Sequence, residues 1–157
     1  MSENAPDDPL VFAFFNEIGI IEQLARNAFE RVMPDGLRLP HFSVLNHFVR
    51  LGGERSPGEL ARAFQVTKGA MTNTLQRLEA RGLIALRPDP RDGRAKLVAI
   101  TPAGRQVREQ AVAALAPQIA ALAARFPEAE FARALPFLRE VRAYLDRERN
   151  ARDGFEG

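Results

Sequence analysis

Apolar residues recur at helical spacing through the N-terminal third of the chain. Asp8 precedes the first run, and we expect it to cap a helix that has Pro9 as its first residue. The helix should end at the Pro-Asp-Gly sequence of residues 34–36. A second helix is predicted over about residues 41–51, before two glycines at positions 52 and 53. This part of the chain therefore predicts two amphipathic helices.

The next segment contains two helix starts in close succession. Ser56 and Glu59 have the spacing of a capping box, in which each side chain bonds the other residue's backbone N–H. Thr67 is placed to cap the following helix, and Val66 is placed to pack onto Met71 four positions inside it. We therefore expect two helices joined by a tight turn, with the second spanning about residues 67–81.

Two short runs of strand-forming residues follow, at 83–87 and 97–101. Residues 88–96 between them are rich in Pro, Asp, Gly and Arg, which predicts a loop. A helix pair followed by such a hairpin indicates a winged helix-turn-helix. The predicted fold class is mainly α, an α+β winged helix with a two-stranded wing and flanking helices.

The C-terminal third is again helical. Thr101 should cap an alanine-rich helix that runs to about residue 125, and a last helix should span about residues 128–149. Pro117 and Pro136 lie inside these two patterns, so we expect a kink or a break at each. Residues after Arg149 are expected to fray.

The long helices at the two ends carry more apolar surface than the small central unit can cover. Burial against a second copy of the chain is the simplest remedy. The predicted organisation is an N-terminal dimerisation helix (1–36), a winged helix-turn-helix DNA-binding domain (37–101) and C-terminal dimerisation helices (102–157).

Composition narrows the class of protein. The chain has no cysteine, which excludes disulfides and thiolate metal sites, and nothing indicates a metal or another cofactor. No run approaches the roughly 18 apolar residues of a membrane span, and the acidic N-terminus does not resemble a signal peptide. We expect a cytoplasmic protein without a membrane partner.

The modest net charge of +2 conceals an uneven distribution. Residues 50–108 hold 12 Lys or Arg against 5 Asp or Glu, a net +7, so the remainder carries −5. Such a basic segment is typical of a surface that binds a polyanion. The alternative is a solvated charge pattern without a partner.

The helix over residues 67–81 has the residues that reading a major groove requires. Met71, Leu75 and Leu78 form its apolar stripe, and Gly69 would allow close approach to DNA. The candidate contacts are Thr67, Lys68, Gly69, Thr72, Asn73, Gln76 and Arg77. A solvated polar face is the alternative.

The hairpin loop strengthens the DNA interpretation, because arginine at a hairpin tip suits a narrow minor groove. The candidates are Arg91, Asp92, Arg94 and Lys96. Phosphate repels Asp92, so we expect it to orient Arg91 or Arg94 through a salt bridge. An ordinary surface ion pair is the alternative.

These residues carry a family resemblance. The stretch from Leu60 to Gly104 resembles the MarR family of bacterial winged-helix transcription factors (multiple-antibiotic-resistance-type regulators). The matching residues are Leu75, Leu78, Glu79, Arg81, Gly82 and Leu83, then Asp89, Arg91, Asp92 and Arg94, then Ile100, Thr101 and Gly104. The resemblance implies a homodimer on a pseudo-palindromic operator, with Arg94 in the minor groove, Asp92 orienting it, and a small aromatic effector that loosens binding. The family's cysteine-based oxidation sensing does not apply.

In the family the effector pocket lies between the winged domain and the dimer helices. The candidates to line it are Phe14, Phe15, His41 and Phe42, with His41 meeting an acid. The alternative is that the phenylalanines belong to the core and that His41 merely begins a helix.

The leading hypothesis is a sequence-specific double-stranded DNA-binding regulator, a repressor modulated by an effector. The second is a winged-helix protein-interaction or architectural module without an effector. An enzyme is disfavoured, because the spacing of His41 and His47 fits neither a metal pair nor a nucleophile site, and no glycine-rich phosphate loop occurs.

Overall fold

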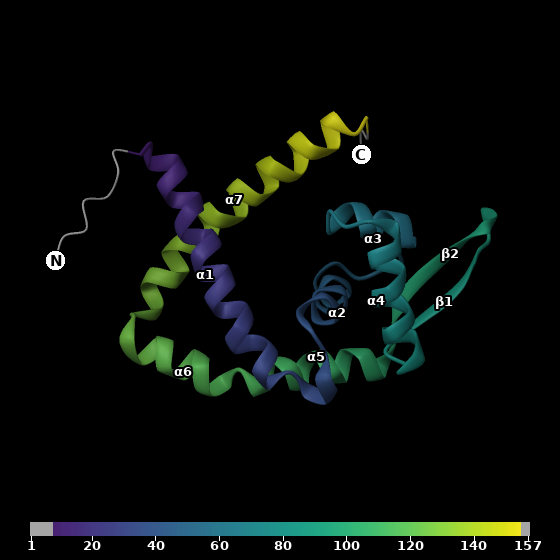
Figure 1. Cartoon of the computed structure of the whole chain (residues 1–157), viewed down its shortest axis with the longest axis horizontal. Helices are drawn as coiled ribbons and strands as arrows, with labels where there is room; N and C mark the ends of the chain where they lie inside the picture. Colours follow the sequence, from purple (N-terminus) through teal and green to yellow (C-terminus); the bar gives the residue numbers. More distant parts are fainter. Residues whose placement is uncertain (1–7, 155–157) are drawn as a thin grey trace. The chain divides into compact units, whose positions relative to one another are not determined.

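The computed structural model describes residues 8–154, which divide into two compact units at Leu115 (Figure 1). The described part is mostly helical, with one two-stranded antiparallel sheet. This confirms the predicted fold class. The elements are α1 (Leu10–Val32), the 3₁₀ helix η1 (Pro34–Gly36), α2 (Leu39–Leu51), α3 (Pro57–Ala63), α4 (Lys68–Ala80), β1 (Ile84–Asp89), β2 (Asp92–Ile100), α5 (Pro102–Ala114), α6 (Ala116–Arg125) and α7 (Glu128–Arg152).

Two helix starts differ from the sequence prediction. Helix α1 begins one residue late, with Pro9 as N-cap and no side-chain cap, so the prediction of Asp8 as the cap was wrong. Helix α2 begins two residues before His41, because Pro40 fits the first turn, where no backbone N–H is needed. The His41 Nδ1 atom accepts a 3.0 Å hydrogen bond from the backbone N–H of Arg38, which lies before the helix.

The caps of the helix pair are as predicted. The Ser56 hydroxyl accepts from the Glu59 N–H at 3.1 Å, and the Glu59 carboxylate accepts from the Ser56 N–H at 2.7 Å. The Thr67 hydroxyl accepts from the Ala70 N–H at 3.1 Å and opens α4. These local bonds fix where the two helices of the helix-turn-helix begin.

The wing is longer than predicted. Strand β1 runs through Asp89 and β2 begins at Asp92, so most of the expected loop 88–96 is strand and only Pro90 and Arg91 form the turn. Pro88 is tolerated because a two-stranded sheet leaves one edge of each strand unpaired. The register shifts between the pairs Pro88–Lys96 and Asp89–Asp92, which leaves residues 93–95 as a bulge.

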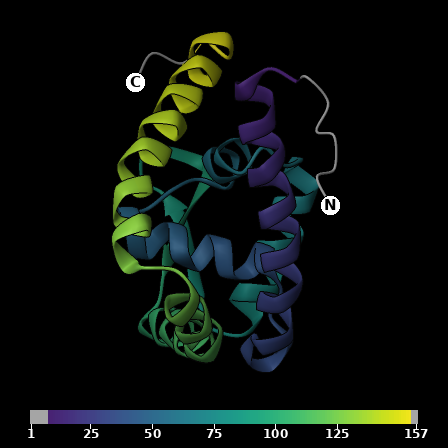
Figure 2. The ribbon, with the colours of Figure 1, turned by 90° about the vertical axis from the view of Figure 1, so that its left-hand side faces the viewer.

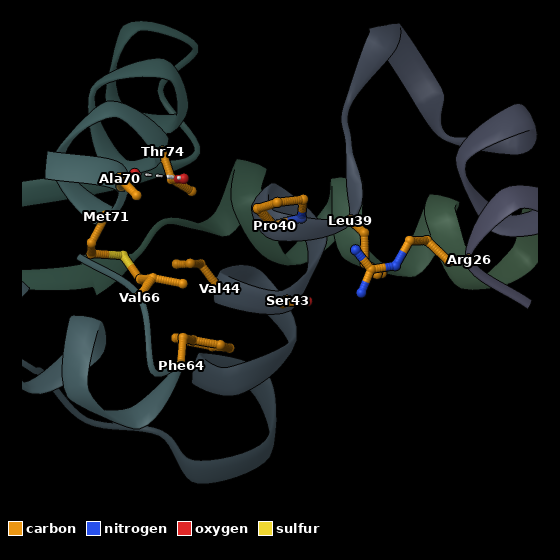
Figure 3. Close-up of a pocket in the computed structure, with 10 residues that line it drawn as sticks. All are labelled: Arg26, Leu39, Pro40, Ser43, Val44, Phe64, Val66, Ala70, Met71 and Thr74. Carbon is orange, nitrogen blue, oxygen red and sulfur yellow. Dashed lines mark hydrogen bonds between the residues drawn. The ribbon is translucent and has the colours of Figure 1, made fainter. Parts of the chain in front are cut away.

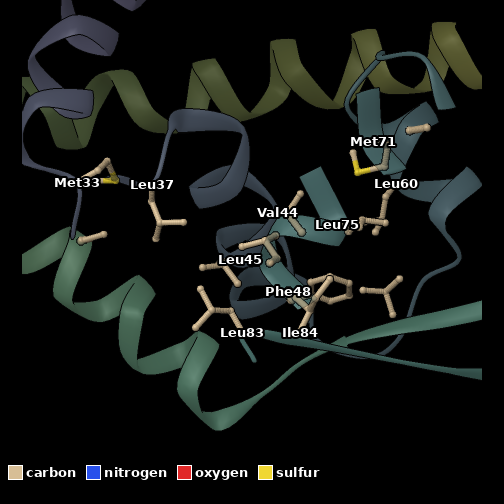
Figure 4. Packing of buried hydrophobic residues seen from close by; sticks show 14 residues of the cluster. Met33, Leu37, Val44, Leu45, Phe48, Leu60, Met71, Leu75, Leu83 and Ile84 are labelled. Atoms are coloured by element: carbon tan, nitrogen blue, oxygen red, sulfur yellow. The ribbon is translucent and has the colours of Figure 1, made fainter. Parts of the chain in front are cut away.

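The core lies between the helices and the base of the wing, as Figure 4 shows. Its largest fully buried side chains are Phe48, Leu45, Leu60, Leu78, Val44 and Val98. Arg55, in the segment between α2 and α3, is joined to Val98 by two backbone hydrogen bonds of 3.1 and 2.8 Å. The wing is therefore tied to the helix pair at its base.

One joint connects α4, β1 and α5. The Thr101 hydroxyl donates to the Gly82 carbonyl at 2.6 Å and accepts from the Gly104 N–H at 3.1 Å. A Cβ at Gly104 would lie 2.0 Å from the Leu83 carbonyl oxygen, so α5 can approach β1 only with glycine here. Gly82, at φ +67°, ends α4 in the left-handed conformation that leads into this joint.

The two interior prolines act differently. The expected alanine-rich helix is interrupted at Leu115, two residues before Pro117, as a proline's clash with the carbonyl four residues earlier requires. Helix α7, in contrast, continues through Pro136 to Arg152 (Figure 2), so no break occurs there. The prediction of fraying directly after Arg149 was wrong, because the helix extends three residues further; residues 155–157 lie outside the described part.

Helices α1, α6 and α7 contain no buried residue in the described chain. Many of their large apolar side chains are instead exposed, for example Leu10 at 85%, Leu24 at 67% and Leu122 at 51%. None of the helices between residues 8 and 154 combines the length and apolar character that crossing a membrane demands.

Candidate nucleic-acid interface

Helix α4 presents a polar face opposite a buried stripe. Met71, Leu75 and Leu78 are at most 3% exposed, as predicted. Gly69, Asn73 and Gln76 follow one another at helical spacing on the opposite side. The candidate contact residues of this helix and its cap are all exposed: Thr67, Lys68, Gly69, Thr72, Asn73, Gln76 and Arg77. A Cβ at Gly69 would meet nothing within 4 Å, so the backbone there is open to a ligand.

The wing carries four further candidates, Arg91, Asp92, Arg94 and Lys96, which are all exposed near its tip. In Figure 1 the β1–β2 hairpin projects beyond α4 within the same unit. Arg94 lies in the bulge, where the regular pairing of the two strands is interrupted. The structure thus brings the polar face of α4 and the arginine-bearing wing together in one unit.

Among the carboxylates of the wing tip, Asp89 rather than Asp92 forms an ion pair with an arginine. The Asp89 Oδ1 atom accepts from the Arg91 N–H at 2.9 Å and lies 3.6 Å from the Arg91 Nε atom. Asp92 instead accepts from the Arg94 N–H at 3.1 Å, and within residues 8–154 it forms no salt bridge. The expected ion pair of Asp92 was therefore wrong, because the tight turn directs its carboxylate to the backbone two residues on.

A second wing contact was not foreseen from the sequence. Glu54, which follows the glycines after α2, accepts two hydrogen bonds from Arg87 of β1: from Nε at 2.7 Å and from Nη2 at 2.5 Å. The hydrogen bonds from Arg87 lower the pKa of the Glu54 carboxyl. The two residues are 33 positions apart, and nothing in their local sequence signals the pairing.

The four residues predicted to line an effector pocket make the following contacts in the structure. Phe14 and Phe15 make an edge-to-face contact on α1, with ring centroids 5.6 Å apart. Phe42 packs on Phe29 at 4.6 Å and against the core. His41 is 7% exposed and is occupied at Nδ1 as a hydrogen-bond acceptor. The core and helix-start alternative therefore fits Phe42 and His41.

Burial, followed by the charges of Arg77, Arg81 and Arg38, lowers the pKa of His41. Burial, with Arg50 and Arg55, likewise lowers the pKa of His47. Both shifts favour the neutral form of the imidazole.

A different cavity, of about 300 Å³, lies among α1, α2, the α3–α4 turn and α4 (Figure 3). It is lined by Arg26, Leu39, Pro40, Ser43, Val44, Phe64, Val66, Ala70, Met71 and Thr74. In Figure 3 the apolar side chains of Phe64, Val66 and Met71 gather on one side, while Arg26 lies apart from them near Leu39. The Arg26 guanidinium is hydrogen-bonded to Glu22 at 2.6 Å.

Comparison with known proteins agrees with this geometry. Residues 35–95 match the family model described as the MarR family. The transcriptional activatory protein BadR of Rhodopseudomonas palustris is 32% identical over 113 residues, which cover 69% of this chain and 65% of BadR. The multiple antibiotic resistance protein MarR of Salmonella typhimurium is 40% identical over 62 residues, 40% of this chain and 43% of that protein. The matched part thus spans less than two thirds of either relative.

Solved structures extend the likeness over most of the chain. The transcriptional regulator BldR of Sulfolobus solfataricus superposes with a TM-score of 0.69 and 28% identity, covering 87% of this chain and 94% of BldR. The apo form of wild-type MarR from Escherichia coli gives a TM-score of 0.70 and 25% identity, covering 87% of this chain and 98% of that one.

The matched proteins are transcription regulators rather than enzymes, in keeping with a site that offers hydrogen-bonding and basic groups but no reactive pair. The likeness extends to both sequence and fold, and the chain belongs to the MarR family.

Proposed function

We propose that the chain is a sequence-specific double-stranded DNA-binding regulator. The observation that carries this proposal is the pairing of an exposed polar helix face with an arginine-bearing wing in one unit. Helix α4 offers Asn73 and Gln76, which suit the edge of adenine in the major groove, and Lys68 near its N-terminus. Arg94, which lies in the bulge, would enter the minor groove, where the potential is most negative.

The functional form is proposed to be a homodimer. Helices α1, α6 and α7 expose large apolar side chains that one copy leaves uncovered, and a two-fold axis would cover the same patches on both copies. The pseudo-palindromic operator would then present two half-sites about 34–36 Å apart, or a multiple of that distance. The proposed sense of regulation is repression, in which the bound dimer blocks access to the DNA it covers.

Fluorescence anisotropy with DNA from upstream of the chain's own gene tests the proposal. We expect Arg94→Ala to weaken operator binding about 10–100-fold for each wing, because charged hydrogen bonds are worth about 1.5–3 kcal/mol. Arg139→Ala, which removes the same charge from an exposed position of α7, should leave binding unchanged. The proposal would be wrong if the protein bound the operator no more tightly than random DNA and Arg94→Ala had no effect. The alternative, a winged helix used for protein contact, would then be preferred.

Modulation by a small aromatic effector is the finer part of the proposal. The cavity beneath α4 has apolar walls, two hydroxyls (Ser43 and Thr74) and one arginine, which suits a small aromatic acid. Because Ala70, Met71 and Thr74 belong to α4, a bound molecule would shift the helix proposed to enter the major groove. A hydroxybenzoate that releases the operator from the wild-type protein, but not from Ser43→Phe, would support this site. Equal release from both proteins would contradict it.

A further inference from the structure

We infer that Glu54 is a positioning residue: through its paired contact with Arg87, it fixes the direction in which the wing carries Arg91 and Arg94 toward DNA. The inference rests on the proposed DNA-binding function and adds a residue that makes no contact with DNA itself.

The geometry is that of an orienting contact. Both carboxylate oxygens of Glu54 are engaged, one by Nε and one by Nη2 of the same guanidinium, at 2.7 and 2.5 Å. A two-point contact between two planar groups fixes angle as well as distance, which a single ion pair does not. The pKa of the Glu54 carboxyl is lowered by these bonds, so the pair stays charged at neutral pH.

The pair also lies where the wing needs support. Arg87 of β1 is in register with Leu97, and the buried part of the wing ends at that pair. Beyond it, residues 88–96 are exposed or only partly covered. Within the described chain, no hydrogen bond or ion pair joins residues 88–96 to anything outside the hairpin. Glu54 is therefore the outermost link between the wing and the helix pair.

The segment that carries Glu54 is itself hydrogen-bonded to the wing. Glu54 precedes Arg55, whose backbone is joined to Val98 of β2 by two hydrogen bonds. The segment thus holds one strand through its backbone and the other through a side chain. Rotation of the hairpin about its base would lengthen at least one of these contacts, so the wing's direction is set by both together.

An alternative is that Arg87 could bind a DNA phosphate and that its ion pair with Glu54 prevents it from doing so. The two possibilities predict opposite effects for Glu54→Gln. With positioning, operator binding weakens and the salt dependence keeps its slope. With release of Arg87, binding tightens, and the slope of log K against log salt steepens by about 0.9 for each new phosphate contact.

The experiment measures operator binding of Glu54→Gln at several salt concentrations. Loss of an exposed ion pair should weaken binding by at most about fivefold for each wing, so a dimer with two wings should lose up to about 25-fold. Binding to random DNA should change little. Unchanged or tighter operator binding would overturn the inference.

Two controls separate position from charge. Glu79→Gln removes a carboxylate from the exposed surface of α4 and should not weaken operator binding. The exchanged pair, Glu54→Arg with Arg87→Glu, keeps the net charge and should restore most of the affinity lost in Glu54→Gln. Failure of the exchange to restore affinity, with the protein folded, would count against positioning.

Hydrogen exchange of the free protein tests the link without DNA. Glu54→Gln should speed exchange of the wing amides and leave those of α4 unchanged. If the wild-type chain does not distinguish operator from random DNA, the proposed function is wrong. The hydrogen-exchange result does not depend on DNA, so it still decides whether Glu54 fixes the direction of the wing. Equal wing exchange in both proteins would overturn the inference.

Discussion

The winged part of the chain and the long helices α1, α6 and α7 use similar apolar residues in opposite ways. In the winged part, Phe48, Leu78 and Val98 are fully buried, and the glycines, caps and strands interlock. The three helices bury no residue within the described chain, and Leu10 of α1 is 85% exposed. One region completes its own core, whereas the other leaves many large apolar side chains exposed.

The difference teaches that periodicity and burial are separate properties. A helical stripe of apolar residues predicts that one face will be covered, but not by what. In α4 the cover comes from the same chain, through α2 and α3. In α1 it is proposed to come from a second copy, so each region should respond differently to substitution and to dilution.

The largest expected effect comes from placing a charge on the uncovered surface. Ile21, on α1, is 61% exposed, so Ile21→Glu should leave the single chain folded. It should disrupt the dimer, because a carboxylate would then be buried in an apolar interface. Loss of the second half-site should weaken operator binding by about 10²–10⁴-fold. Analytical ultracentrifugation measures the mass, and anisotropy measures the binding.

A matched control lies on the same helix. Asn27→Glu adds the same charge at an exposed polar position of α1 and should remain dimeric. If Ile21→Glu sediments as the wild-type protein does, the apolar face of α1 is not the dimer surface, and the contrast between the two regions loses its explanation.

The next effect compares two glycines in the winged part. Gly104→Ala places a Cβ 2.0 Å from the Leu83 carbonyl oxygen and should lower the free energy of unfolding by about 3 kcal/mol. Gly69→Ala meets nothing within 4 Å and should raise it by about 0.5–1 kcal/mol, as expected for an exposed helical glycine. Denaturant titration followed by circular dichroism measures both.

Gly69→Ala also tests the interface. If the backbone at Gly69 approaches DNA closely, the more stable variant should bind the operator more weakly than the wild-type protein. If Gly69→Ala is more stable and binds the operator as the wild-type protein does, Gly69 is not part of the interface. If Gly104→Ala is as stable as Gly69→Ala, the close packing described at Gly104 is contradicted.

The smallest effect concerns pH and His41. Its pKa in the folded state is lowered below the ordinary value of 6.5, first by burial and then by Arg77, Arg81 and Arg38. As the pH falls, the unfolded chain therefore takes up the proton at a higher pH than the folded chain does. The neutral His41 thus contributes to the free energy of unfolding above pH 6.5, and this contribution is lost as the pH falls below 6.5. His41→Asn keeps a hydrogen-bond acceptor for the Arg38 N–H and should make the free energy of unfolding depend less on pH.

Thermal unfolding between pH 7.5 and 5 measures this dependence. His41→Leu should cost about 1 kcal/mol at pH 7.5, because the Arg38 N–H loses its acceptor. Part of the acid dependence should remain in His41→Asn, since burial also lowers the pKa of His47. An unaltered pH profile in His41→Asn would show that His41 does not contribute.

Much of the fold follows from local sequence signals. The caps at Ser56 and Thr67 and the buried stripe of α4 are set by residues within four positions of each other, and the structure has them as predicted. The wing strands were predicted too short, because pairing between strands extends through residues such as Pro88 whose own preference is for a loop.

The candidate site was less predictable where distant residues meet. The identity of the arginine partner in the wing depends on the turn geometry, which directs Asp89 to Arg91 and Asp92 to a backbone N–H. The contact of Glu54 with Arg87 joins residues 33 positions apart. The cavity under α4 shares no residue with the predicted pocket, because Phe42 and His41 are used in packing and in the start of α2.

The bulge at residues 93–95 also bears on how such a protein can diversify or be redesigned. It separates the tip of the wing from the pairs that enter the core, the innermost being Ile84–Ile100. Residues added or removed within the bulge would change the reach of Arg94 without moving any side chain of those inner pairs to the opposite face of the sheet. Wing length is thus a variable that evolution or an engineer can alter independently of the rest of the domain.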